Sequence, residues 1–73
     1  MVATNITNCI RTLRQKHDEM TQQVLAEKVG VTRQTLNAIE LGKYSPSLEV
    51  AFRIAEVFQL SVDEVFQHNK GAQ

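Results

Sequence analysis

The stretch from Gln22 to Leu41 constrains this chain more than any other, because its residues fit two helices joined by a tight turn. Ala26 is small enough to let a second helix approach closely, and Gly30 can adopt the positive φ that such a turn requires. The apolar residues of the stretch recur at helical spacing, which predicts one shared buried face. These residues are Leu25, Val29, Val31, Leu36 and Ile39.

The second of these predicted helices leaves a polar face on its outer side. Arg33, Gln34 and Asn37 lie on this face, together with the small residue Ala38. Arg, Gln and Asn side chains suit the edges of bases in a DNA major groove. A solvated helix face is the alternative, and the complete turn pattern beneath it favours contact with DNA. The stretch therefore predicts a helix-turn-helix and sequence-specific DNA binding.

Composition places the chain among small globular proteins. Its 73 residues are enough for one domain, and its hydrophobic fraction of 42% is too high for a disordered chain. No apolar run is long enough to span a membrane, and the start of the chain lacks the pattern of a signal peptide. The single cysteine excludes an internal disulfide and a cysteine-based zinc site. We therefore expect a soluble, cytoplasmic protein.

The net charge is unusual for a nucleic-acid binder. Eight Lys and Arg residues balance eight Asp and Glu residues, whereas DNA-binding domains are usually basic. A neutral monomer is expected to bind phosphates weakly. Useful affinity would then require a homodimer, or backbone amides and neutral side chains at the phosphates.

Helical periodicity and capping residues predict an all-α fold of five short helices and no strands. The predicted helices cover about residues 6–17, 22–28, 32–41, 47–58 and 62–66. Thr21, Thr32 and Ser47 are suitable N-caps, and Ser61 with Glu64 matches a capping box. The fourth helix is expected to bury Leu48, Ala51, Ile54, Ala55 and Phe58. The predicted domain covers residues 6–67, with the helix-turn-helix at 22–41 and flexible ends at 1–5 and 68–73.

Three segments carry a resemblance to a known family. They are IRTLRQ (10–15), MTQQVLAEKVGVTRQTLNAIELGKYSPSLEVAFRIAEVFQ (20–59) and LSVDEVFQ (60–67), which together cover most of the chain. They resemble the Xre family, the compact five-helix DNA-binding domains similar to lambda repressor and Cro, and in particular its short stand-alone regulators. The chain departs from the family pattern in a loop at 17–19 that is one residue longer, and in Gln59, where relatives usually have glycine.

The resemblance implies roles for individual residues. Arg33, Gln34 and Asn37 match positions that contact bases, where Arg suits guanine O6 and N7, and Gln or Asn suits adenine N6 and N7. Arg14 and Glu40 match a salt bridge between the first and third helices. The implied phosphate contacts are Gln22, Thr32, Thr35, Lys43 and Tyr44.

The other notable residues have structural explanations. Cys9 is expected in the core, His17 and His68 lack partners for a metal site, and the helix start explains Asp63 and Glu64. The residues Val50, Phe52 and Val57 exceed what one buried face of the fourth helix needs. They belong either to the core or to a dimer surface.

The leading functional hypothesis is a transcriptional regulator that binds double-stranded DNA as a homodimer on a short operator. The alternatives are a protein-interaction module that has lost DNA binding, and an antitoxin or restriction-control regulator. An enzyme is not expected, because no nucleophile–base pair, metal cluster or phosphate loop is present in the sequence. We also expect no cofactor, no small-molecule ligand and no membrane association.

Overall fold

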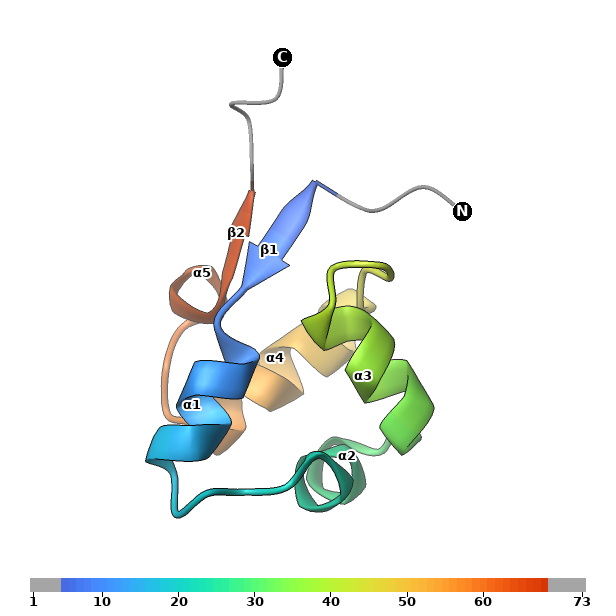
Figure 1. Ribbon diagram of the computed structural model, residues 1–73. Helices are drawn as coiled ribbons and strands as arrows, with labels where there is room; N and C mark the ends of the chain where they lie inside the picture. The colour runs from blue at the N-terminus through green and yellow to red at the C-terminus, as the bar shows by residue number, and fades with distance from the viewer. Residues whose placement is uncertain (1–4, 69–73) are drawn as a thin grey trace.

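The computed structural model describes residues 5–68, which form five helices and two short strands around one core (Figure 1). In chain order the elements are β1 (Ile6–Asn8), α1 (Ile10–Lys16), α2 (Gln22–Val29), α3 (Arg33–Glu40), α4 (Leu48–Val57), α5 (Val62–Val65) and β2 (Phe66–His68). Helix α4 crosses the centre, with α1 and α5 towards one side and α3 towards the other (Figure 1). The predicted five-helix architecture is confirmed. No helix in the described part of the chain is long and apolar enough to cross a membrane.

The two strands correct the prediction at both ends of the domain. β1 pairs with β2 in antiparallel register, with Ile6 opposite His68 and Asn8 opposite Phe66. The first helix therefore begins at Ile10 rather than near Ile6, and His68 belongs to a strand rather than to a tail. Helical periodicity could not reveal this pairing, because each strand depends on a partner at the other end of the chain. The rest of the predicted flexible ends, 1–4 and 69–73, lies outside the described residues.

Short polar side chains begin the helices where the sequence predicted. The hydroxyls of Thr21, Thr32 and Ser47 each accept a hydrogen bond from the backbone N–H three residues later, at 3.0–3.2 Å. Ser61 and Glu64 form the predicted capping box at the start of α5, where the Ser61 N–H donates to the Glu64 carboxylate at 2.9 Å. These bonds satisfy amide groups that have no partner within the first turn of a helix.

Helices α2, α3 and α4 are each followed by a residue in the left-handed conformation. Gly30, with φ of 81°, ends α2, Gly42, with φ of 75°, follows α3, and Gln59, with φ of 57°, follows α4. After each of them, an N–H reaches back five residues: Val31 to the Ala26 carbonyl at 3.1 Å, Lys43 to the Ala38 carbonyl at 3.0 Å, and Leu60 to the Ala55 carbonyl at 3.0 Å. The end of α4 is therefore hydrogen-bonded in the same way as the end of α2, although its left-handed residue is Gln59 and not a glycine.

The core is apolar and draws on every helix. Its buried residues are Ile10, Leu25, Ala26, Val29, Leu36, Ile39, Ala51, Ile54, Ala55, Val65 and Phe66. Cys9 is half-buried, and its thiol lies 3.7 Å from the Val65 carbonyl oxygen.

The expectation for Leu48 was wrong, since its side chain is 71% exposed. This residue opens α4, and a helical side chain leans towards the amino-terminal end, in this case past the edge of the core. Phe58, also expected in the core, is half-buried. Val50 and Val57 pack against the core, whereas Phe52 is 58% exposed. Of the two alternatives for these residues, core or dimer surface, the two valines belong to the core, and Phe52 does not.

Candidate nucleic-acid interface

Helices α2 and α3 form the two arms of the helix-turn-helix. Leu36 and Ile39 fix α3 to the core, with exposed fractions of 0% and 1%. Ala26, 1% exposed, lies at the buried face of α2. Gly30 is in the left-handed conformation, which favours glycine, and a Cβ atom added there would lie 3.3 Å from the guanidinium of Arg53 on α4. The orientation of α3 is thus set by burial along one side.

The opposite side of α3 carries the three predicted base contacts. Arg33, Gln34 and Asn37 are all exposed. Arg33 and Gln34 are the first two residues of the helix, and neither has a side-chain hydrogen bond or ion pair within the described part of the chain. The polar groups of both side chains are therefore available to a ligand.

The loop after α3 adds a second group of exposed residues. Lys43 and Tyr44 lie beside the outer side of α3 and line a shallow recess with Gln34, Thr35 and Ala38. Thr32 and Thr35 are bonded to each other through their hydroxyls at 3.0 Å, and the Thr32 hydroxyl also caps α3. Of the predicted phosphate contacts, Lys43, Tyr44 and Thr32 are exposed, whereas Thr35 and Gln22 are half-buried.

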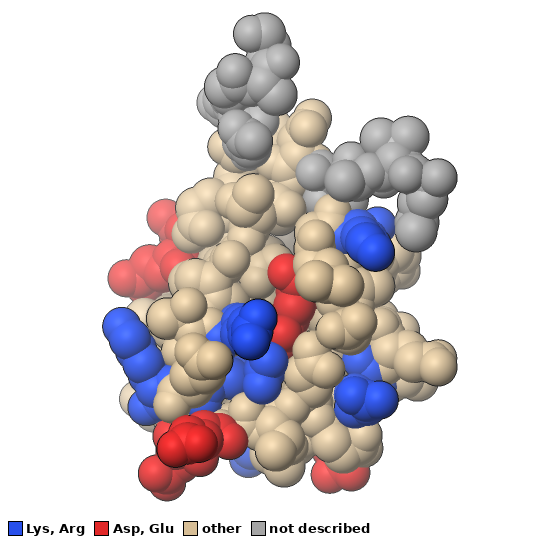
Figure 2. All heavy atoms as spheres, viewed as in Figure 1, with Lys and Arg blue, Asp and Glu red and all other residues tan. Residues whose placement is uncertain are grey.

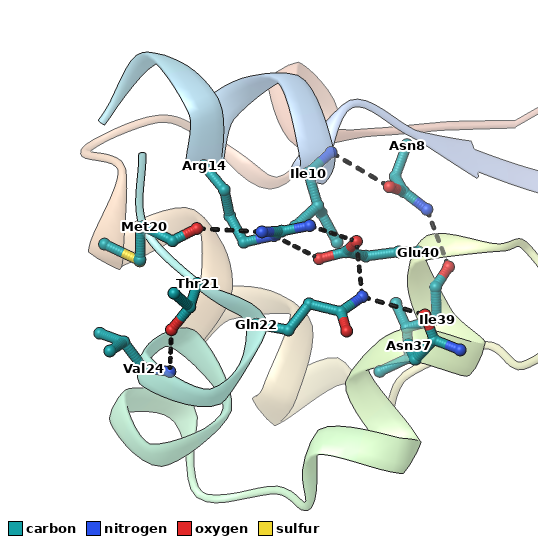
Figure 3. A network of polar contacts seen from close by, with 10 residues as sticks. All are labelled: Asn8, Ile10, Arg14, Met20, Thr21, Gln22, Val24, Asn37, Ile39 and Glu40. Carbon is teal, nitrogen blue, oxygen red and sulfur yellow. Dashed lines mark hydrogen bonds and ion pairs between the residues drawn. The ribbon is translucent and has the colours of Figure 1, made fainter. Parts of the chain in front are cut away.

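A chain of polar contacts lies behind this surface and joins α1, α2 and α3 (Figure 3). Arg14 donates to both carboxylate oxygens of Glu40, at 2.7 and 2.9 Å, and to the Met20 carbonyl at 2.9 Å. The exposed fractions of the Arg14 and Glu40 side chains are 12% and 6%. A nearly buried, two-point ion pair of this kind holds the end of α3 against α1.

Gln22 extends this chain of contacts to the exposed surface. Its amide nitrogen donates to Glu40 Oε1 and to Asn37 Oδ1, each at 3.0 Å. A phosphate contact through the Gln22 side chain, implied by the resemblance, would require its nitrogen to leave one of these partners. The backbone N–H at the start of α2 has no such restriction.

Asn8 is a positioning residue that the sequence reasoning missed. Its amide nitrogen donates to the Ile39 carbonyl at 2.9 Å, and its oxygen accepts from the Ile10 N–H at 3.1 Å. The side chain therefore links the start of α1 to the last turn of α3 (Figure 3). An asparagine just before an apolar helical pattern is a typical helix-start residue, and this was the available signal.

Basic side chains are spread over this side of the molecule. Figure 2 shows them over α1, over α3 and over the loop after α3, while acidic side chains lie mainly at the edges of the view. Among the described residues, no cluster of three or more His, Cys, Asp or Glu side chains is arranged to hold a metal ion.

Comparison with known proteins gives the family. The family model described as "Helix-turn-helix" matches residues 10–65. A regulator of Methanocaldococcus jannaschii, named an HTH-type transcriptional regulator, is 48% identical over 59 residues, which are 81% of this chain and 88% of the relative. The chain belongs to the Xre-type helix-turn-helix family. The members of this family are DNA-binding transcriptional regulators and not enzymes.

Other members of the helix-turn-helix family show similar agreement. An HTH-type transcriptional regulator of Bacillus subtilis is 51% identical over 45 residues, covering 62% of this chain and 68% of the relative. Among solved structures, the P22 c2 repressor in complex with a synthetic operator superposes with a TM-score of 0.69 at 28% identity. That match covers 74% of this chain and 80% of the repressor chain. The lambda-repressor-like fold expected from the sequence is thereby confirmed.

Proposed function

We propose that this helix-turn-helix protein is a sequence-specific transcriptional regulator that inserts α3 into the major groove of its operator. The observation that carries the proposal is the division of α3 into two sides. Leu36 and Ile39 are buried, while Arg33 and Gln34 extend outward from the first turn without partners in the described part of the chain. Helix-turn-helix proteins read base edges with the amino-terminal residues of this helix.

The neighbouring residues are suited to phosphates on either side of the groove. Lys43 and Tyr44 extend the outer surface beyond α3, and Thr32 lies at its amino-terminal end. Neutral donors matter here, because the chain has a formal net charge of +0. Thr and Tyr hydroxyls and backbone amides position a protein on DNA without adding charge.

Arg33 and Lys43 are expected to differ in what they contribute to binding. Arg33→Ala should weaken binding to the selected operator by about 1–3 kcal/mol and relax the preference at one base pair. Lys43→Ala should weaken binding to all sequences and reduce the salt slope by about 1. Fluorescence anisotropy at two salt concentrations, with operator and random duplexes, measures both effects. Wild-type protein that binds no duplex more tightly than random DNA would contradict the proposed function.

We also propose that the regulator binds its operator as a homodimer. Leu48 and Phe52 are 71% and 58% exposed and stand four residues apart on α4, so they share one side of that helix. Two exposed large apolar side chains on a small domain favour burial against a second copy. Two-fold symmetry would place the two α3 helices about 34 Å apart, one turn of DNA.

Phe52→Glu is expected to convert the dimer to a monomer, because a carboxylate would be buried without a partner in the interface. Val24→Glu is the matched control, since Val24 is also an exposed apolar residue, 42% exposed, but lies on α2. Light scattering at micromolar concentration should show a dimer for the wild type and the control, and a monomer for Phe52→Glu. A wild-type monomer, both free and on operator DNA, would remove the dimer proposal.

A further inference from the structure

We propose that Gln22 orients the Asn37 amide so that Asn37 reads DNA as a hydrogen-bond donor and selects acceptors on base edges: guanine O6 and N7, thymine O4, or adenine N7 without the adenine N6 amino group. This inference rests on the proposed function, because it concerns how α3 would read a major groove. It narrows the expectation from sequence, in which Asn37 was suited to adenine through one donor and one acceptor.

The direction of the hydrogen bonds is set at the charged end of the network. A guanidinium group only donates, and an ionised carboxylate only accepts. Arg14 donates to both oxygens of Glu40, at 2.7 and 2.9 Å, in a nearly buried pair. Any further neighbour of the Glu40 carboxylate must therefore approach it with a donor.

Gln22 is that neighbour, and the carboxylate determines which way its amide faces. Its nitrogen lies 3.0 Å from Glu40 Oε1. Exchanging the nitrogen and oxygen of the Gln22 amide would bring two acceptor oxygens together, which is unfavourable. The same nitrogen lies 3.0 Å from the Asn37 side chain, so the Asn37 atom that meets it must also be an acceptor.

Asn37 consequently has its oxygen turned towards Gln22 and its nitrogen turned away (Figure 3). The carboxamide is planar, so fixing one atom fixes the other. Asn37 is exposed, and its nitrogen has no acceptor within the described part of the chain. It can donate to an acceptor on a base. The N6 amino group of adenine or the N4 amino group of cytosine would instead have to share the Asn37 oxygen, through its second lone pair, on the side of the amide that already faces Gln22.

Gln34 provides a contrast on the same helix. Its side chain is exposed and has no hydrogen bond to the described residues, so its amide can face either way. The network therefore distinguishes two amide side chains that look equivalent in the sequence. The Gln34 amide can present either its nitrogen, as a donor, or its oxygen, as an acceptor, to a base, whereas the Asn37 amide presents its nitrogen.

The test starts from operator sequences selected out of random DNA with wild-type protein and with Asn37→Ala. The base pair whose preference is lost in Asn37→Ala is the pair that Asn37 contacts. At this pair, synthetic duplexes then have either one acceptor removed or weakened (7-deazaguanine in place of guanine, 7-deazaadenine in place of adenine, or 4-thiothymine in place of thymine) or one donor removed (purine in place of adenine, or 2-pyrimidinone in place of cytosine). Anisotropy measures the affinity of each protein for each duplex.

Wild-type protein should lose about 10-fold in affinity when the acceptor is removed, and less than about twofold when the donor is removed. Gln22→Met keeps the length of the side chain but removes the amide, so Asn37 can rotate and should respond to both deletions. Gln23→Met is the matched control, because Gln23 is exposed and its side chain bonds, among the residues that the structure describes, only to Glu27, at 3.0 Å. It should behave as wild type.

Two results would overturn the inference while leaving the proposed function intact. One is specific operator binding in which no base-pair preference depends on Asn37. The other is a loss of fivefold or more in wild-type affinity when only the donor is removed. Failure of the proposed function is recognised separately, since no duplex would then be selected at all. The wild-type measurements decide the question even if Gln22→Met does not fold.

Discussion

Arg14→Met is expected to lower the free energy of unfolding by about 3–5 kcal/mol, the range for breaking a buried ion pair on one side only. The substitution leaves the Glu40 carboxylate, 6% exposed, without the guanidinium that contacts both of its oxygens. It also removes the bond to the Met20 carbonyl. Urea unfolding followed by circular dichroism measures the change. For a small domain such a loss is a large part of the total stability.

Two further variants separate burial from charge. Glu49→Gln breaks the Arg53–Glu49 pair, whose side chains are 49% and 73% exposed, and should change stability by less than about 0.5 kcal/mol. Arg14→Met combined with Glu40→Leu should lose less than Arg14→Met alone, because no unpaired charge remains. If the free energy of unfolding of Arg14→Met lies within about 1 kcal/mol of the wild-type value, the Arg14–Glu40 pair does not hold α3 as described.

Leu36→Ala should destabilise the protein by about 2–5 kcal/mol, because it removes a fully buried side chain and leaves a cavity under α3. Leu48→Ala makes the same chemical change at a side chain that is 71% exposed, and should cost much less in the monomer. Thermal unfolding of both variants at the same low concentration gives the comparison. Equal losses of stability in the two variants would mean that the buried side of α3 does not anchor this helix to the core.

Local chemistry explains why the helices were predicted well. Thr21, Thr32 and Ser47 accept hydrogen bonds from amides three residues later, which depend only on the adjacent chain. The spacing of Leu36 and Ile39 likewise places Arg33 and Gln34 on the opposite side of the same helix. Exposure of the predicted base-contact residues follows from that geometry alone.

The strands were missed because nothing local distinguishes them. Ile6 has apolar spacing with Ile10 and Leu13 that also fits a helix, and a three-residue strand is too short for alternation to be recognised. Its partner, β2, directly follows α5, with Phe66 opposite Asn8. Only the folded chain brings the two ends of the domain together, and Asn8 then gains its contacts to Ile10 and Ile39.

The sequence by itself determined the five helices, most of their ends and the outward side of α3, because capping and periodicity act over a few residues. Tertiary structure alone decided what Gln22 and Asn37 do with their amides. Their 3.0 Å contact exists because α2 and α3 cross there, and its direction comes from a carboxylate held by Arg14 on a third helix. The direction of a hydrogen bond between helices depends on which side chains meet in the folded protein. The spacing of residues along the chain does not reveal it.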